Sequence, residues 1–367
     1  MKLFKQLFAA PAALGLLVTA AEIKADDFSA TTTISGEANF TSGVVNIEDN
    51  PDHELHMIYS YKIDSSTSFS GDDALKVSIE AGNAPASTRI ATEGIVYGDN
   101  SLKVSNLYYT KALTDELLYA VGPMFEMDAL VSTTTSTYSN DGMFNGWWYA
   151  PNNLSNHPKS GAPGLAVAWM SEEGYNLGFS TIWANGADPT KGIGSDLGFD
   201  VTTLSAGYDG DNFGGGLIYT LYDDPSDLFD NVYDENGNAI TGSILGDPIF
   251  IGIGAYWNVN DRFDISVGMD SLDFDYQNYD TATVFSVGAD YDIGPGTLSA
   301  GMADVLGYDT SNGSQDNAGV AYEIYYNWDV SDGVTVKPMM MFHVLDSSGS
   351  TNWADETMWG VETTFKF

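Results

Sequence analysis

Apolar and polar residues alternate with a period of two along most of this chain. The clearest segment is 263–270, whose odd positions are all apolar: Phe263, Ile265, Val267 and Met269. The same alternation recurs at 175–183, 320–328 and 359–367. Successive side chains of a β-strand point to opposite faces, so each segment predicts a strand with one apolar and one polar face.

The pattern predicts sixteen strands joined by connections that alternate between short and long. Short connections, such as 171–174 and 258–261, are built from turn residues, whereas 185–197 and 223–247 are much longer. An up-and-down barrel with both termini on one side has an even strand count and this rhythm of connections, which a Greek-key sandwich does not produce. The predicted strands are 30–40, 53–63, 74–82, 102–111, 116–125, 163–171, 175–184, 198–208, 212–222, 248–257, 262–270, 283–291, 297–305, 319–328, 334–344 and 356–367.

The composition of the two strand faces also separates a barrel from a soluble sandwich. The polar face is rich in Gly, Ser, Asp and Asn, and the apolar face carries aromatic residues near the strand ends. Lipid outside, water inside and aromatic girdles at the interfaces require this arrangement. We therefore predict an all-β fold, a transmembrane antiparallel up-and-down β-barrel. Segment 102–111 fits two registers, so its facing stays open.

The N-terminal residues 1–25 have the pattern of a secretory signal peptide. Lys2 and Lys5 precede an apolar stretch from Leu7 to Ala21, and Ala25 is a plausible last residue before cleavage. A buried N-terminal helix is the alternative. No run of eighteen apolar residues follows, so residues 26–367 contain no predicted transmembrane helix. We expect them to form one barrel domain.

The chain is strongly acidic, with 13 basic residues, 51 acidic residues and a formal net charge of −38. Nucleic-acid binding is excluded because it needs a basic surface. The charge suits an aqueous lumen that favours cations, or a surface that faces salty water, or solubility alone. Cysteine is absent, which rules out disulfides and thiolate metal sites.

Two segments carry a resemblance to a known family. Residues 67–83, Thr-Ser-Phe-Ser-Gly-Asp-Asp-Ala-Leu-Lys-Val-Ser-Ile-Glu-Ala-Gly-Asn, and the hairpin 104–124 resemble cyanobacterial outer-membrane porins related to the carbohydrate-selective (OprB-like) porin family. The resemblance implies a homotrimeric outer-membrane barrel without a cofactor. Members often carry an N-terminal surface-layer-homology domain, for which we expect no room here. The terminal Phe367 also resembles the signal that the outer-membrane assembly machinery reads.

The longest connection, 126–162, would be the third external loop, which folds into the lumen of general porins. We expect it to narrow the pore with three acidic residues, Glu126, Asp128 and Asp141; an external lid or a trimer contact is the alternative. Five basic residues cluster between 62 and 111: Lys62, Lys76, Arg89, Lys103 and Lys111. The alternation turns Lys62 and Lys76 to the lumen, so either they face this loop across the constriction or they pair with wall carboxylates such as Glu80.

These features predict passive diffusion of small hydrophilic solutes and ions, without covalent chemistry. The alternatives are a substrate-selective carbohydrate channel, a barrel enzyme and a structural or adhesive barrel. His343 near Ser347 and Ser348 is the best candidate for a catalytic dyad. The acidic stretch 223–238 has enough oxygen ligands for calcium but lacks the EF-hand spacing, so a solvated loop is the favoured interpretation.

Overall fold

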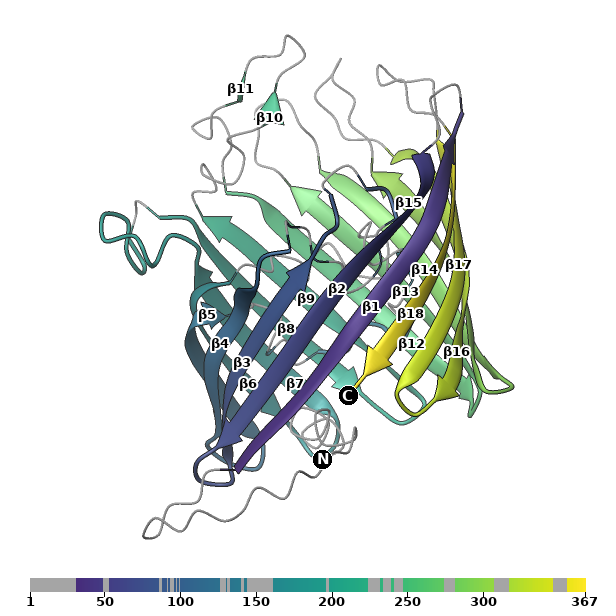
Figure 1. The fold of residues 1–367 in the computed structure, drawn as a ribbon. Coiled ribbons are helices and arrows are strands. Elements are labelled where there is room, and N and C mark those ends of the chain that lie inside the picture. Colours follow the sequence, from purple (N-terminus) through teal and green to yellow (C-terminus); the bar gives the residue numbers. More distant parts are fainter. Residues whose placement is uncertain are drawn as a thin grey trace.

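Sixteen strands close into one barrel in which every strand pairs antiparallel with its neighbours (Figure 1). This arrangement confirms the predicted all-β barrel. The computed structural model describes residues 31–48, 53–85, 88–90, 92, 96, 98, 100–125, 130, 133–139, 142–143, 161–195, 198–223, 232–233, 239–240, 247–273, 281–306, 317–345 and 355–367. No described helix is long and apolar enough to span a membrane.

All sixteen barrel strands lie where the alternation predicts them, within a few residues at most ends. The main differences are β1, which extends to Ile47, and β2, which extends to Ser68. A further short pair, β10 (Val232–Tyr233) with β11 (Ala239–Ile240), lies in a long connection. The barrel strands are β1 (Thr31–Ile47), β2 (His53–Ser68), β3 (Asp73–Gly82), β4 (Lys103–Ala112), β5 (Leu117–Phe125), β6 (Ala162–Met170), β7 (Tyr175–Trp183), β8 (Asp200–Asp209), β9 (Phe213–Asp223), β12 (Ile249–Asn260), β13 (Phe263–Asp273), β14 (Ala282–Ile293), β15 (Gly296–Leu306), β16 (Asn317–Ser331), β17 (Val334–Leu345) and β18 (Glu356–Lys366).

The connections divide the barrel into two rims. Tight turns join the strands at the short-turn rim, where β1 begins and β18 ends, and longer segments join them at the opposite, long-loop rim. Gly174 and Gly294 in two of the turns have φ angles of 95° and 63°, which only glycine adopts without strain. The predicted signal peptide 1–25 and nearly all of the acidic stretch 223–238 lie outside the described residues.

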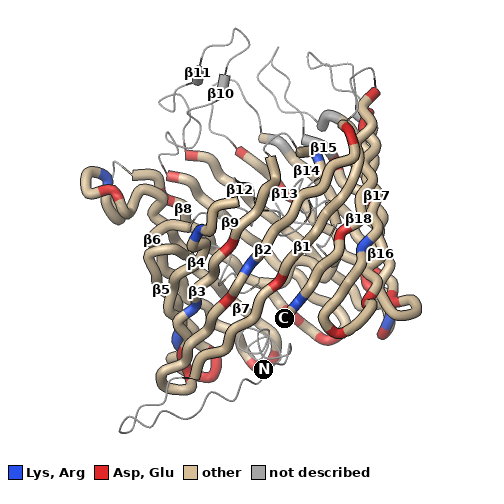
Figure 2. The backbone as a smooth tube through the Cα atoms, in the orientation of Figure 1, with Lys and Arg blue, Asp and Glu red and all other residues tan. Residues whose placement is uncertain are grey.

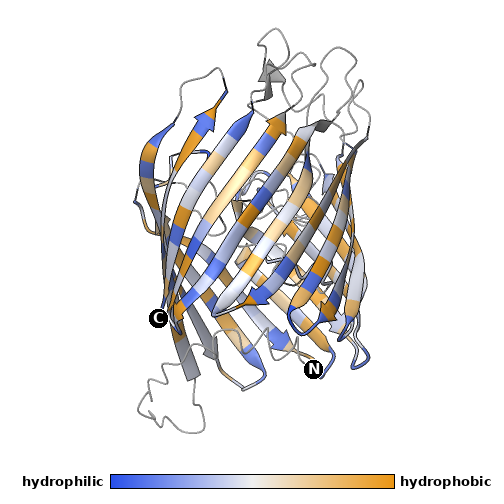
Figure 3. Cartoon of the chain, turned by 90° about the vertical axis from the view of Figure 1, so that its right-hand side faces the viewer, coloured by the Kyte–Doolittle hydropathy of each residue, from blue (hydrophilic) through white to orange (hydrophobic). Residues whose placement is uncertain are grey.

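The two faces of the wall differ as the alternation predicts. Val267 and Trp328 point outward and are 49% and 46% exposed, whereas Ser266 and Glu323 point inward and are 1% and 4% exposed. Apolar positions recur along the strands of the barrel wall (Figure 3). In segment 102–111, whose facing the sequence left open, Asn106, Tyr108 and Thr110 point inward. The pairing of β4 with β3 shifts register between Ser78 and Ile79, which explains why the sequence fits two registers.

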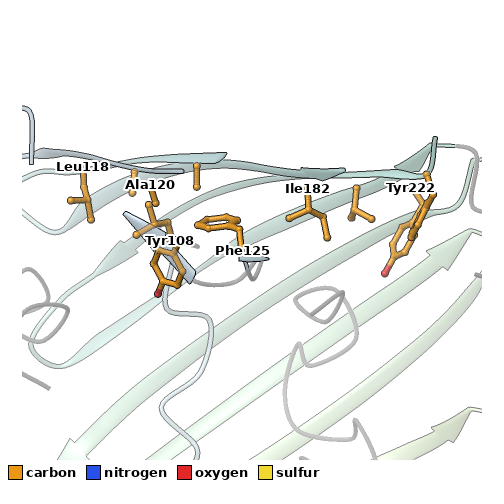
Figure 4. Packing of buried hydrophobic residues seen from close by; sticks show 11 residues of the cluster. Tyr108, Leu118, Ala120, Phe125, Ile182 and Tyr222 are labelled. Atoms are coloured by element: carbon orange, nitrogen blue, oxygen red, sulfur yellow. The ribbon is translucent and has the colours of Figure 1, made fainter. Parts of the chain in front are cut away.

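The inner face is not uniformly polar, because two apolar clusters lie against it. One cluster contains Phe125 and Ile182 of the wall (Figure 4). Leu130, in the connection between β5 and β6, belongs to the same cluster. The other joins Met339 and Met358 with Ile90 and Met143, which belong to two different connections. Inward apolar side chains therefore mark the places where connecting segments pack against the wall.

Candidate functional site

The candidate site is the inner face of the wall. Three lysines lie on this face: Lys62 on β2, Lys76 on β3 and Lys103 on β4. Each is the register partner of an inward-facing residue on an adjacent strand, which is Glu80 for Lys62 and Lys103 and Tyr108 for Lys76. The facing predicted for Lys62 and Lys76 agrees with this register. The acidic partners predicted for them, Glu126, Asp128 and Asp141, lie outside the described residues.

Five neighbouring strands carry a row of alternating charge. Lys366 pairs in register with Glu37, Glu37 with Lys62, Lys62 with Glu80, and Glu80 with Lys103. Lys366 is the last residue of β18, at the short-turn rim, and Lys103 is the first residue of β4, at its long-loop end. The row therefore runs obliquely across the wall, from the short-turn rim toward the long-loop rim. Figure 2 shows basic and acidic positions interspersed on this part of the barrel. Opposite charges directly across strands attract, and they orient the field along the row.

Two of these lysines have further contacts on the inner face. The Lys62 Nζ atom lies 3.8 Å from Asp64 Oδ1, and Asp64 accepts a hydrogen bond from the Ser78 hydroxyl at 2.5 Å. The Lys76 Nζ atom lies 5.7 Å from the centre of the Tyr108 ring, within the range of a cation–π contact. Wall carboxylates thus lie beside Lys62, whereas an aromatic face lies beside Lys76.

Arg89 lies apart from the other predicted basic residues. It follows β3 in the connection 83–102, and its guanidinium donates a hydrogen bond to Glu356 at the start of β18. The side chain of Glu356 is 5% exposed and that of Arg89 is 40% exposed. Sequence reasoning placed Arg89 at the pore but missed its partner, since the two residues are 267 positions apart.

The opposite part of the wall carries negative charge alone. From β5 to β16, every charged side chain within the described strands is acidic. Asp290 on β14 and Glu323 on β16 are inward and nearly buried. The basic residues of the strands lie on β2, β3, β4, β17 and β18. The inner face is therefore electrostatically asymmetric around the barrel.

Described residues of the connection between β5 and β6 bond to this acidic part of the wall. The Tyr138 hydroxyl donates to Glu323 at 2.5 Å, and the Ser139 amide donates to Asp290 at 2.7 Å. The amide of Thr137 donates to the Ser266 hydroxyl at 2.9 Å. Two of these bonds go to inward carboxylates, Asp290 and Glu323, and the third goes to a serine hydroxyl. In the sequence, only their polar position in the alternation distinguishes the two carboxylates.

A buried ion pair lies on the same face between β17 and β18. Lys337 Nζ is 2.6 Å from Glu362 Oε1, and both side chains are at most 6% exposed. The hydroxyl groups of Thr41 and Thr92 donate to the other oxygen of Glu362 at 2.9 and 2.5 Å. Removing a charge from water is costly unless it is paired, so this network compensates the burial of both ions.

The residues of the alternative catalytic site show a different arrangement. His343 is buried on the inner face, with its Nδ1 atom 3.8 Å from Glu356 Oε2. Ser347 and Ser348 lie outside the described residues. The described part of the chain contains no group of three or more His, Cys, Asp or Glu residues placed to hold a metal ion.

No protein-family model matches this sequence, and no curated protein matches it. Solved structures do match. A mutant of the Rh. blastica porin is 16% identical with a TM-score of 0.56, over 92% of this chain and 100% of that one. Pseudomonas putida OprB, at high pH, is 13% identical with a TM-score of 0.60, over 92% of this chain and 94% of that one. This chain therefore has the barrel fold seen in these porins.

Proposed function

We propose that this chain is an outer-membrane porin that lets small hydrophilic solutes and ions diffuse through a water-filled barrel. The observation that carries the proposal is the division of a closed wall into an apolar outer face and a polar, charged inner face. Large side chains such as Phe285 and Trp257, 56% and 58% exposed, are unfavourable in water but suit lipid. Closure of the barrel pairs the backbone groups at the edges of the first and last strands, and a lipid bilayer requires such pairing because it offers no water to replace it.

The size of the barrel supports an open pathway. Sixteen strands enclose more space than inward side chains of ordinary size can fill, so water occupies the remainder. We place the constriction where the connection 126–162 meets the lumen, with Glu126, Asp128 and Asp141 on one side. Lys62, Lys76, Arg89 and Lys103 are the basic residues that oppose them.

The charge asymmetry of the wall supports a weak preference for cations. Asp290 and Glu323 belong to a sector that carries only acidic charges, whereas the basic residues of the other sector alternate with carboxylates such as Glu80. A lumen with a negative electrostatic potential concentrates cations and lets anions pass less readily.

Conductance across a planar bilayer tests this function. Purified protein should form long-lived, water-filled channels whose reversal potential in a salt gradient has the sign of cation preference. A matched protein unfolded in urea and never refolded serves as the control for detergent leakage. Protein that inserts as a folded barrel yet conducts no ions would contradict the proposal.

A carbohydrate-selective channel is the second candidate. The arrangement that favours it is Lys76 beside the Tyr108 ring on the inner face, because sugars bind to aromatic faces with donors nearby. Liposome swelling with sugars of graded size separates the two candidates. General diffusion predicts a rate that falls smoothly with solute size, whereas selectivity predicts one sugar that departs from this trend.

The location and assembly follow from the same proposal. We place the barrel in the outer membrane of a Gram-negative-type cell, such as a cyanobacterium, in contact with lipid. A homotrimer is the expected assembly. An apolar groove of about 540 Å³ on the outer face, lined by residues including Val44, Leu55 and Trp359, is where a neighbouring subunit could contact the wall. Mass photometry of the detergent-extracted protein tests the assembly, and a uniform monomer would contradict it.

A further inference from the structure

Four methionines lie together on the inner face of the barrel, against β17 and β18. Met339 and Met341 occupy alternate positions of β17, and Met358 on β18 is the register partner of Met341. Met143 comes from the connection between β5 and β6 and belongs to the same buried cluster. All four residues are at most 5% exposed. We call these four residues the methionine cluster.

Gly360 marks the point where two of these side chains meet. Gly360 is the register partner of Met339. A Cβ atom added to Gly360 would lie 3.4 Å from Cγ of Met339 and 3.4 Å from Cε of Met143, and each of these atoms is bonded to the sulfur of its side chain. Met341 and Met358 face each other directly, which places their Cβ atoms roughly 4.5–5.5 Å apart. The thioether groups of the cluster therefore gather over one short stretch of β17 and β18.

Packing alone does not account for the choice of methionine. The apolar cluster around Phe125 also holds a connection against the wall, and its described residues are Leu, Ile, Val, Phe, Tyr and Ala, without any methionine. The methionine cluster, in contrast, contains four of the 12 methionines in the chain. Methionine differs from leucine by a polarizable thioether sulfur, which is a soft electron donor. The residue type therefore points to the sulfur as well as to the volume of the side chain.

His343 extends the inward series of β17 by one more position. It is buried, and its Nδ1 atom lies 3.8 Å from Oε2 of Glu356 on β18. Its register partner, Glu356, is two positions from Met358, so the imidazole lies diagonally across from the Met358 side chain. A metal-binding histidine typically directs one ring nitrogen to a carboxylate, which orients the other nitrogen toward the metal. The imidazole of His343, with Glu356 behind it and the thioethers beside it, has this order of groups.

Carboxylates around the methionine cluster favour a cation. Glu323 on β16 is the register partner of Met341 and accepts a hydrogen bond from the Tyr138 hydroxyl. Glu356 is the second carboxylate, and Arg89 balances its charge. A carboxylate beside the cluster lowers the free energy of a nearby cation. Because the thioethers are neutral, a monovalent ion leaves less charge to be compensated in this buried position than a divalent ion.

We propose that the methionine cluster binds a soft monovalent cation, Cu(I), through its thioether sulfurs, with His343 as a nitrogen ligand. Soft thioether ligands select Cu(I), and the chain has no cysteine that could supply a thiolate. The ion enters as Cu(I), so no electron is transferred at the site. The inference goes beyond the proposed pore and holds whether or not the barrel conducts ions. Because Met143 belongs to a connection and the other ligands belong to the wall, the bound ion would tie this connection to β17 and β18.

Competition with a coloured chelator complex measures Cu(I) binding to the folded barrel in detergent. Under anaerobic conditions with ascorbate, the protein should take one Cu(I) ion per chain from the bicinchoninate complex, which then loses its colour. Met341→Leu with Met358→Leu should weaken binding by more than about 100-fold, because loss of a group that only orients a ligand already costs roughly 10–100-fold. His343→Gln should weaken binding by about tenfold. Leucine is close to methionine in volume, so the double variant should keep the fold.

Met340→Leu is the matched control. Met340 lies between Met339 and Met341 on β17, but it pairs with the outward Trp359, which is 46% exposed, and faces away from the lumen. This variant should keep the Cu(I) affinity of the natural chain. An equal loss of affinity in Met340→Leu, or no transfer of Cu(I) to the natural chain, overturns the site.

Nuclear magnetic resonance of the methionine methyl groups tests the site in the natural chain itself. Ag(I) replaces Cu(I) as a soft ion that keeps its oxidation state. The methyl signals of the methionine cluster should shift on addition of Ag(I), whereas the signal of the outward Met302, 44% exposed, should not. Zn(II) at the same concentration should shift none of them. Unchanged cluster signals, or equal shifts from Ag(I) and Zn(II), overturn the site and show that the methionines only pack the connection against the wall. A barrel that binds Cu(I) but conducts no ions contradicts the pore and leaves the copper site established.

Discussion

Gly36 and Phe367 close the barrel at the seam between its first and last strands. The Gly36 amide donates to the Phe367 carbonyl oxygen at 2.8 Å, and the Phe367 amide donates to the Gly36 carbonyl oxygen at 2.9 Å. The Phe367 ring lies over Gly36, and it stacks on Tyr61 of β2 with the ring centres 6.1 Å apart. The last residue of the chain is therefore a structural part of the seam.

Substitution of Gly36 should loosen this seam. A Cβ atom at Gly36 would lie 2.6 Å from the Phe367 ring, so Gly36→Ala should displace the ring and cost about 1 kcal/mol of unfolding free energy. Urea titration of the refolded protein in detergent measures the effect. Gly198→Ala is the matched control, because its Cβ meets the nearest atoms at an ordinary 3.6 Å. An equal loss of unfolding free energy in both variants would contradict the role of the Phe367 ring in the seam.

Deletion of Phe367 separates a structural role from a role in assembly. The deletion removes two backbone hydrogen bonds and a ring contact, which together should cost about 2 kcal/mol during refolding in detergent. Phe367→Ala keeps the backbone bonds and should cost less. If the residue is also an assembly signal, both variants should reach the membrane in cells less than their stability in vitro predicts. Normal assembly of both would argue against the signal.

The buried ion pair of β17 and β18 should be sensitive to loss of one partner. Lys337→Met leaves Glu362 charged and nearly buried, so we expect about 3–5 kcal/mol of destabilisation. Lys62→Met, whose ion pair with Asp64 is more than 40% exposed on both sides, should cost less than about 1 kcal/mol. Chemical unfolding of the two variants measures the difference, and similar losses would show that the Lys337 pair is not effectively buried.

Charge reversal at Lys62 and Lys76 should change ion selectivity. Both side chains face the lumen, so Lys62→Glu with Lys76→Glu should shift the reversal potential in a salt gradient toward greater cation preference. Lys111→Glu is the matched control, because Lys111 lies beside Asp72 of a tight turn and away from the row of alternating charge. An unchanged reversal potential in the double variant would contradict a role for these lysines in the pore.

We expect the acidic stretch 223–238 not to bind calcium. Its spacing lacks the EF-hand register, so we expect solvated carboxylates that do not retain calcium. Equilibrium dialysis with a calcium radiotracer should show the same binding in the natural chain and in a variant that lacks the stretch. Binding that disappears with the deletion would reveal a calcium site.

The strand count and the facing of nearly every strand could be predicted from the sequence. Val267 and Ser266 differ in exposure because adjacent strand residues point to opposite faces, and this property is local. Segment 102–111 is the exception, since the register shift between β3 and β4 depends on its neighbour. The alternation could also place Lys62 and Lys76 on the inner face, because facing needs no knowledge of register.

Tertiary structure decided which charges meet. The row from Lys366 to Lys103 exists because five strands pair in one particular register, which no single strand encodes. Closure of the sheet brings Glu356 beside Arg89 and Phe367 beside Gly36 across most of the chain length. The alternation determines the faces of each strand, whereas closure and register determine the partners across them.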